Sequence, residues 1–290
     1  MLNREEKEKL LDYLIQFLRP EKKYPLLPGV SDPEAVADFI GIEYGEYQSI
    51  LENFEKQVKM ASEELLKDEE ILEAIDKLPF ENNDTIVLIG DSVADDRQGW
   101  FQILQNALNL HVEKADFKWV DASLGGETTT QAMLRLSRDV LSHEPDWVFL
   151  AFGNDDAQRP HIHESRTVIS LAEFWENLST MEEALNLQLE NPLVWITPTP
   201  PITEMMVEVP LFNGILQEEV LQEYREVIAG KTGYIVDPTG SRMGNPPEAW
   251  NYMSDGFHHS IAGHLITVKE IIKLLSSDAP VHEGSKVKKQ

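Results

Sequence analysis

The 290-residue chain contains no cysteine, which excludes disulfides, thiolate metal sites and a cysteine nucleophile. It also lacks long hydrophobic runs, because no uninterrupted apolar stretch approaches the roughly 18 residues of a membrane-spanning helix. The segment from Met1 to Lys9 is charged and has no apolar region of the kind found in a secretory signal. We therefore expect a cytoplasmic protein without a membrane span.

Positive charge is scarce: the chain has 25 basic and 51 acidic residues, and its formal net charge is −26. Nucleic acids and anionic membrane surfaces carry the same sign and are poor partners for such a chain. Residues 37–50 do have the small-residue and glycine spacing of a helix-turn-helix, which would predict salt-sensitive DNA binding. No lysine or arginine occurs from Tyr24 to Glu55, however. We therefore expect no nucleic-acid partner, and a packing or association role for this segment.

The chain divides near residue 80. Before Pro79 the pattern is helical throughout, with Leu10, Leu11, Leu14, Ile15 and Leu18 on one face of the first helix. An amphipathic helix needs a partner for its apolar face. Residues 1–79 are therefore predicted to form an all-helical module that caps the active site or joins subunits of a homo-oligomer.

After Pro79, short apolar runs alternate with segments of helical spacing. The runs lie at residues 86–89, 119–120, 147–152, 193–197 and 234–236. Continuous apolar strands separated by helices predict a parallel sheet covered on both faces. We expect an α/β domain over residues 80–278, a three-layer αβα sandwich with a five-stranded parallel sheet of flavodoxin-like type, followed by a disordered tail at residues 279–290.

Small or polar clusters follow the first three predicted strands, at Gly90-Asp91-Ser92, Gly125-Gly126-Glu127-Thr128 and Gly153-Asn154-Asp155. The carboxyl ends of parallel strands meet at one edge of the sheet, where α/β proteins place their sites. Asp255 and His258 occur together near the other end of the chain. A serine nucleophile needs an imidazole to take its proton and a carboxylate to orient that imidazole. The sequence therefore points to a serine hydrolase.

These four clusters, in this order over roughly residues 84–275, resemble the SGNH hydrolases, also called GDSL esterases and lipases. The resemblance implies that Ser92 is the nucleophile and that Asp255 and His258 complete the catalytic triad. It further implies an oxyanion hole made by Ser92, Gly126 and Asn154. Two positions depart from the family pattern: Val93 replaces a leucine after the serine, and Phe152 replaces a glycine of the third block.

Each cluster also has a plainer interpretation. Ser92 and Asp255 could cap helices, and Asn154 with Asp155 could simply form a turn. The segment Gly90-x-Ser92-x-Ala94 is one residue away from the nucleophile elbow of α/β-hydrolases. In that fold the acid and the histidine come from separate loops, so the short spacing of Asp255 and His258 favours the SGNH form.

No cofactor and no metal are expected. His161, His163 and Glu164 are the nearest approach to a metal-ligand cluster, but they lack a further paired ligand. The chain has no P-loop, dinucleotide fingerprint or zinc-protease helix.

The substrate is harder to predict than the reaction. Trp250, Tyr252 and Phe152 are candidate substrate-binding residues, since aromatic rings can stack on a sugar. An apolar loop over residues 205–212 would instead suit an acyl chain, and loop packing explains either feature as well. The expected function is a serine carboxylic-ester hydrolase acting on a small or medium acyl ester, such as a sugar acetyl ester, a lysophospholipid or a thioester. The alternative is a non-catalytic binding or scaffold protein that retains the SGNH fold.

Overall fold

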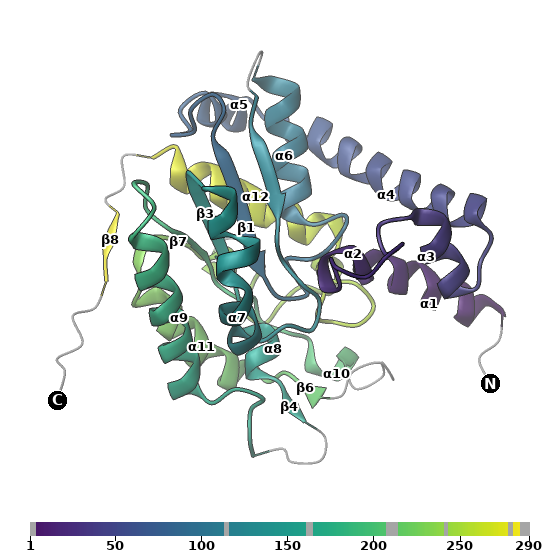
Figure 1. Ribbon diagram of the computed structural model, residues 1–290. Coiled ribbons are helices and arrows are strands. Elements are labelled where there is room, and N and C mark those ends of the chain that lie inside the picture. Colours follow the sequence, from purple (N-terminus) through teal and green to yellow (C-terminus); the bar gives the residue numbers. More distant parts are fainter. Residues whose placement is uncertain are drawn as a thin grey trace.

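A six-stranded sheet forms the centre of the computed structural model, which describes residues 4–112, 116–160, 165–206, 214–240, 243–277 and 281–284 (Figure 1). The strand order is β2-β1-β3-β5-β7-β8, and the first five strands are parallel. These strands are β1 (Thr85–Gly90), β2 (Lys118–Asp121), β3 (Trp147–Ala151), β5 (Val194–Ile196) and β7 (Thr232–Val236). The predicted five-stranded parallel sheet is confirmed.

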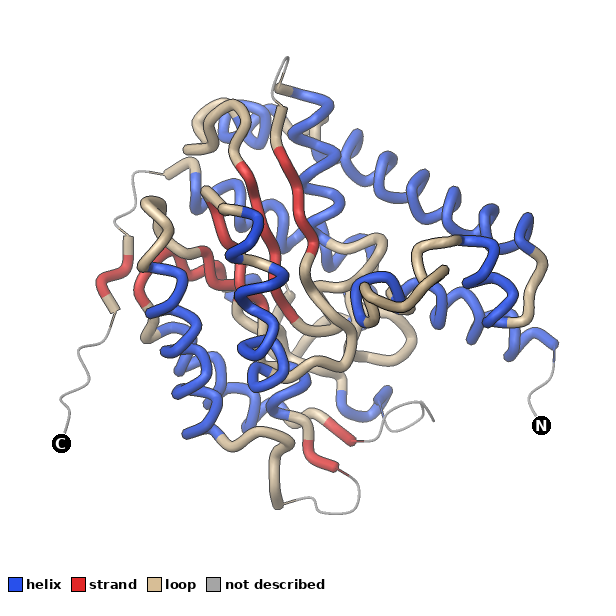
Figure 2. The backbone as a smooth tube through the Cα atoms, in the orientation of Figure 1, coloured by secondary structure: helices blue, strands red, loops and turns tan. Residues whose placement is uncertain are grey.

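Helices cover both faces of the sheet, as the alternating pattern predicts (Figure 2). Every residue of β1 and β3 is buried, which explains why these strands are apolar without alternation. One apolar cluster joins the sheet to α4, α5, α6 and α12, and a second joins its other face to α7, α9 and α11. The fold is therefore a three-layer αβα sandwich.

The described helices and remaining short elements have the following bounds. The helices are α1 (Arg4–Phe17), α2 (Pro20–Lys23), α3 (Pro33–Ile40), α4 (Tyr44–Leu65), α5 (Glu69–Ile75), α6 (Trp100–His111), α7 (Thr129–Asp139), α8 (Asn154–Ala157), α9 (Leu171–Asn186), α10 (Thr203–Met206), α11 (Glu218–Ala229) and α12 (Ile261–Leu275). Short 3₁₀ turns occur at Leu141–His143, Pro238–Gly240 and Ala249–Asn251, and β4 (Arg159–Pro160) pairs with β6 (Gly214–Ile215). None of these helices is long and apolar enough to cross a membrane.

The N-terminal helices are joined closely to the α/β core. Leu65 of α4 and Ile71 of α5 belong to the same apolar cluster as β1 and α6. Farther from the sheet, a smaller cluster around Ile15 and Phe54 holds α1, α3 and α4 together. The C-terminal end of α4, together with the whole of α5, therefore belongs to one helical layer of the sandwich. Helices α1 to α3 extend beyond this layer.

Polar contacts fix the end of α1 against the loop that follows β1. The side-chain amide of Gln16 donates to both carboxylate oxygens of buried Asp96 at 2.8 Å. The guanidinium of Arg97 donates to the carbonyls of Ile15 and Leu18, each at 3.0 Å. Lys22 of α2 pairs with Asp95 at 2.5 Å. These contacts bring α1 to the carboxyl edge of the sheet, where the functional clusters lie.

Part of the predicted disordered tail is ordered. In β8 (His282–Glu283), Gly233 pairs with His282 and Thr232 with Glu283 in antiparallel register. A sheet edge presents backbone donors and acceptors that a following segment can satisfy whatever its side chains are. This pairing corrects the tail prediction for residues 282–283. Residues 278–280 and 285–290 lie outside the described ranges.

Candidate active site

Ser92 lies in a tight turn directly after β1. At Gly90 a β-carbon would come within 2.7 Å of the Ala151 carbonyl oxygen, so the close approach of β1 and β3 at this edge requires glycine. The Asp91 carboxylate accepts the Val93 backbone N–H at 3.2 Å and holds the turn. The next helix begins at Trp100 with Gly99 at its N-cap. Ser92 is therefore not a helix cap.

Asp255 and His258 form a buried pair. The distance from His258 Nδ1 to Asp255 Oδ2 is 2.8 Å. The other carboxylate oxygen, Oδ1, accepts the backbone N–H groups of Phe257 and His258 at 2.8 and 2.9 Å. Burial raises the pKa of Asp255, but the hydrogen bonds from His258 and the backbone outweigh it and lower this pKa overall. Ser260, not Asp255, caps α12. The carboxylate is thus held ionised against the imidazole.

Ser92 and His258 line the same pocket, which has a volume of about 370 Å³. Its lining residues are Tyr13, Phe17, Ser92, Gly125, Gly126, Thr128, Asp155, Gln158, Val168, Phe257 and His258. The structure therefore brings together the predicted nucleophile, the predicted base with its carboxylate, and Gly126. Because Nδ1 is bound to Asp255, Nε2 is the ring nitrogen that can take a proton from a nucleophile in this pocket.

Two residues of α1 contact the histidine, and neither was predicted from the sequence. The hydroxyl oxygen of Tyr13 lies 3.0 Å from His258 Nδ1, and the ring centroid of Phe17 lies 4.1 Å from that of the imidazole. Burial and the neighbouring Asp255 raise the pKa of Tyr13, so its hydroxyl stays protonated. Amphipathic spacing shows that one face of α1 packs against another part of the protein, but it does not identify that part. This contact joins segments 245 residues apart.

In the third cluster the side chain of Asn154 is bound to Asp91. The Asn154 side-chain amide donates to both Asp91 carboxylate oxygens at 3.3 and 3.1 Å, and Asn154 is not among the residues that line the pocket. The residue that faces the pocket is Asp155, whose Oδ2 accepts the Ser92 backbone N–H at 3.4 Å. The assignment of Asn154 to the oxyanion hole therefore stays a prediction, and in this structure the amide is directed at Asp91. Since Asn154–Ala157 is one helical turn, a shift of one residue along it changes which side chain faces Ser92.

Several buried carboxyl groups surround this turn. Burial raises the pKa of Asp155 to about 6, against the opposing influence of the Ser92 hydrogen bonds and His258. Burial and nearby Asp155 also raise the pKa of Asp91 well above its ordinary value. Asp156, which accepts hydrogen bonds from Thr129, has a pKa raised by burial to about 7. Three buried carboxyl groups with raised pKa values, those of Asp91, Asp155 and Asp156, thus lie in or beside this turn.

The three aromatic residues predicted to bind substrate lie elsewhere. Phe152 is buried in the apolar cluster between the sheet and α7, α9 and α11. Tyr252 is buried, and its hydroxyl donates to the Pro200 carbonyl at 2.5 Å. Trp250 is exposed, and its indole donates to Glu248. None of the three lines the pocket that holds Ser92, whose aromatic lining residues are Tyr13, Phe17 and Phe257.

Two features noted in the sequence cannot be placed. His161, His163 and Glu164 lie outside the described residues, and so does most of the apolar loop, at residues 207–212. Met205 and Met206 belong to α10.

Comparisons with known proteins show the family and the fold of this chain. Residues 88–266 match the model of the GDSL-like lipase/acylhydrolase family. Esterase TesA of Pseudomonas aeruginosa is 28% identical over 104 residues, which are 34% of this chain and 47% of TesA. A GDSL esterase/lipase of Arabidopsis thaliana is 27% identical over 139 residues, which are 46% of this chain and 44% of that protein. An uncharacterized lipoprotein of Bacillus subtilis, YqeF, is 36% identical over 81 residues, 28% of this chain and 30% of YqeF.

The matched segments span less than half the length of each of these curated relatives. Among solved structures, a lipase/acylhydrolase from Enterococcus faecalis aligns with a TM-score of 0.53 and 24% identity, covering 67% of this chain and 95% of that one. The acetylxylan esterase Axe2 from Geobacillus stearothermophilus aligns with a TM-score of 0.57 and 16% identity, covering 69% of this chain and 98% of Axe2. Both share the fold. Because the family model extends over well more than half of the sequence, this chain belongs to the GDSL-like lipase/acylhydrolase family.

Proposed function

We propose that this protein is a serine carboxylic-ester hydrolase that works through an acyl-enzyme. The observation that carries the proposal is the buried Asp255–His258 pair, 2.8 Å apart, in one pocket with Ser92 and Gly126. A serine, an imidazole and an orienting carboxylate are the parts that nucleophilic acyl transfer requires. The esterases among its relatives support the same chemistry.

The reaction follows from these groups. Ser92 Oγ attacks the ester carbonyl while His258 Nε2 takes its proton, and Asp255 stabilises the imidazolium through Nδ1. Negative charge that develops on the carbonyl oxygen is stabilised by the backbone N–H groups of Ser92 and Gly126. The tetrahedral intermediate then expels the alcohol, which receives the proton from His258. Water, deprotonated by His258, attacks the acyl-enzyme. The second tetrahedral intermediate then expels Ser92 Oγ, which takes the proton back from His258 as the carboxylic acid leaves.

The walls of the pocket favour an acyl group over a sugar. Phe17, Val168 and Phe257 provide apolar surface beside Ser92, whereas the exposed indole of Trp250 lies outside the pocket. Apolar surface selects hydrocarbon, and a sugar needs a larger set of hydrogen-bonding groups. The alternative, a scaffold without turnover, does not require an imidazole held between a carboxylate and a serine-lined pocket.

The test is ester hydrolysis by the wild-type protein. We expect turnover of p-nitrophenyl acetate and butyrate, and complete inactivation by one equivalent of an organophosphorus fluoridate, which phosphorylates activated serines. Measurable turnover with full sensitivity to this reagent supports the function. Absence of turnover on every ester, or turnover that the reagent leaves intact, would contradict it.

Asp155 gives the proposed mechanism an unusual pH dependence. Its carboxyl accepts the N–H of Ser92, the same donor that the oxyanion needs. Above its pKa of about 6 the carboxylate repels the developing negative charge, whereas below it the neutral carboxyl can donate a hydrogen bond. The other titratable groups that influence this position are Asp91, Glu127, His258, Tyr13 and Asp156. Asp155 therefore stabilises the oxyanion at low pH, and this stabilisation is lost as the pH rises through about 6.

Asp155→Asn is expected to raise kcat/KM at pH 8 by about 10- to 100-fold, because asparagine supplies a neutral donor at every pH. One oxyanion donor is typically worth about 100-fold or more in rate. Asp155→Ala is the matched control, since it removes the repulsion without adding a donor and should give a smaller gain. The measurement is kcat/KM on p-nitrophenyl acetate from pH 5 to 9. Parallel pH profiles for wild type and Asp155→Asn would show that Asp155 does not act on the oxyanion.

A further inference from the structure

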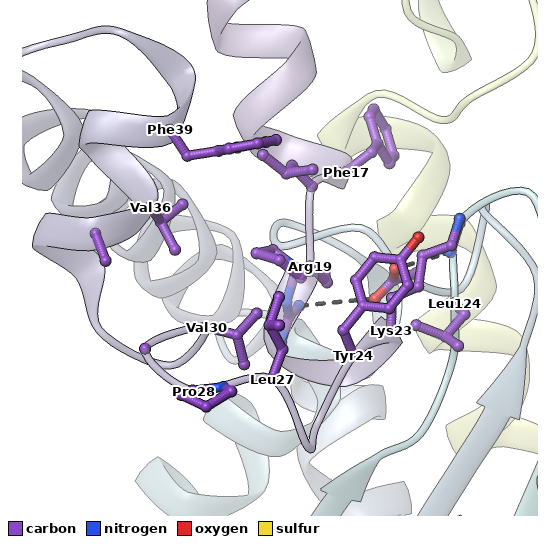
Figure 3. A pocket seen from close by; sticks show the side chains of 16 residues that line it. Phe17, Arg19, Lys23, Tyr24, Leu27, Pro28, Val30, Val36, Phe39 and Leu124 are labelled. Carbon is purple, nitrogen blue, oxygen red and sulfur yellow. Dashed lines mark hydrogen bonds and ion pairs between the residues drawn. The ribbon is translucent and has the colours of Figure 1, made fainter.

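A second pocket, of about 500 Å³, lies between the N-terminal segments and the loops at the sheet edge (Figure 3). One wall comes from the end of α1, from the segment that follows α2, and from α3. The facing wall comes from Leu124 and Gly125. Most of the side chains around it are hydrocarbon, including Phe17, Leu18, Leu27, Val30, Val36 and Phe39. This lining suits an apolar ligand.

The pocket adjoins the site of the proposed reaction. Phe17 and Gly125 line both this pocket and the one that contains Ser92 and His258. The Phe17 ring lies against the His258 imidazole at 4.1 Å between centroids. The two pockets therefore adjoin at Phe17 and Gly125.

Three charged residues line the pocket: Arg19, Lys23 and Asp95. Arg19 lies 2.7 Å from Glu21 and 3.8 Å from both Asp95 and Asp121. Lys22 pairs with the same two aspartates at 2.5 and 2.8 Å. These carboxylates neutralise Arg19, whereas Lys23 is exposed and adds a positive charge to the pocket. Hydrocarbon side chains nevertheless make up most of the lining, so they provide most of the surface that a ligand would contact.

Large apolar side chains remain exposed to water around this pocket. Phe39 is 82% exposed and Leu27 is 58% exposed. Exposed apolar surface beside a cavity is typical of a binding site that a ligand covers. The walls formed by residues 17–39 precede the segment that matches the family model, which begins at residue 88. The feature thus belongs to the N-terminal extension of this chain.

We propose that this pocket binds the hydrocarbon chain of the acyl group, so that the substrates are esters of medium-length fatty acids. The inference rests on the proposed function, because the chain reaches the pocket while its carbonyl lies at Ser92. It also gives the helical N-terminal segment a role in substrate choice. The alcohol part of the ester would lie toward the open side of the first pocket.

The expected result is a steep dependence on chain length. Each buried methylene contributes about a fourfold gain in binding. Octanoate has six more methylenes than acetate, and burial of three or four of them is enough for kcat/KM on p-nitrophenyl octanoate to exceed that on the acetate by about 100-fold. The measurement is kcat/KM for the acetate, butyrate, hexanoate and octanoate, below the concentration at which each ester aggregates.

Two neighbouring leucines supply a matched pair of variants. Leu27 lines the pocket, whereas Leu26 does not and is 91% exposed. Leu27→Ser should lower the octanoate-to-acetate ratio of kcat/KM about fourfold or more, and Leu26→Ser should leave this ratio at the wild-type value. Ala35→Trp, at an exposed position of α3 on the pocket wall, should lower the ratio about tenfold by filling the space. Thermal unfolding of each variant shows whether it is folded.

The outcomes separate this inference from the proposed function. Ser92-dependent hydrolysis with equal kcat/KM for acetate and octanoate would overturn the acyl-chain pocket and leave the esterase function standing. Equal effects of Leu26→Ser and Leu27→Ser on the ratio would also overturn it. Absence of hydrolysis on every ester would contradict the function itself, and this inference with it.

Discussion

Replacing Ser92 by alanine is expected to lower kcat/KM on p-nitrophenyl esters by at least about 10⁴-fold. Without Oγ no acyl-enzyme can form, and the remaining acceleration comes only from substrate binding and backbone donors. The protein should stay folded, since the substitution removes a single oxygen from a turn that is held by the Asp91 carboxylate and the backbone. The measurement is steady-state kinetics beside a thermal unfolding curve.

Ser123→Ala is a suitable control for this variant. Ser123 is also fully buried and follows β2 at the same sheet edge, but its hydroxyl donates to Asp121 and does not line the pocket. We expect Ser123→Ala to keep kcat/KM within a few-fold of wild type. Activity of Ser92→Ala within tenfold of wild type would exclude Ser92 as the nucleophile.

Replacing His258 by alanine should cost about as much as replacing Ser92, again at least about 10⁴-fold in kcat/KM. The imidazole takes the Ser92 proton and later gives it to the leaving alcohol, so both chemical steps depend on it. Asp255→Asn should follow with a loss of about 10³- to 10⁴-fold, because an amide cannot stabilise the imidazolium or fix its tautomer as the carboxylate does.

The double variant Ser92→Ala/His258→Ala gives the sharper result. Residues that act as one unit are strongly non-additive, so the double variant should be no slower than either single variant. If the two losses in kcat/KM instead multiply, the double variant is slower by about 10⁸-fold, or falls below the single variants as far as the assay can detect. This result would show that the two residues act independently and would contradict the triad.

The sheet and its helical layers were predictable from the sequence because the physical signal is local and strong. Buried strands such as 86–89 and 147–151 are apolar at every position, and the helices between them keep helical spacing. The sixth strand was not predictable, since the pairing of His282 and Glu283 with β7 uses backbone groups and leaves no pattern in the side chains.

The sequence predicted those site residues that come directly after a strand or that belong to one short motif. Ser92 and Gly126 come just after β1 and β2, and Asp255 lies three residues from His258, so topology brings them together. Asn154 and Asp155 differ by one position in a turn, and no local pattern determines which side chain faces Ser92. Contacts between α1 and His258 depend on packing over a long sequence separation. They could be known only from the fold.

The most direct test of the esterase mechanism is to trap the acyl-enzyme. Wild-type protein mixed with p-nitrophenyl butyrate and quenched in acid within the first turnover should show an intact mass increased by one butyryl group. Peptide mapping should place that group on Ser92, and the same experiment with Ser92→Ala should show no increase. Turnover without any acylated protein, or an acyl group carried by a different residue, would contradict the account.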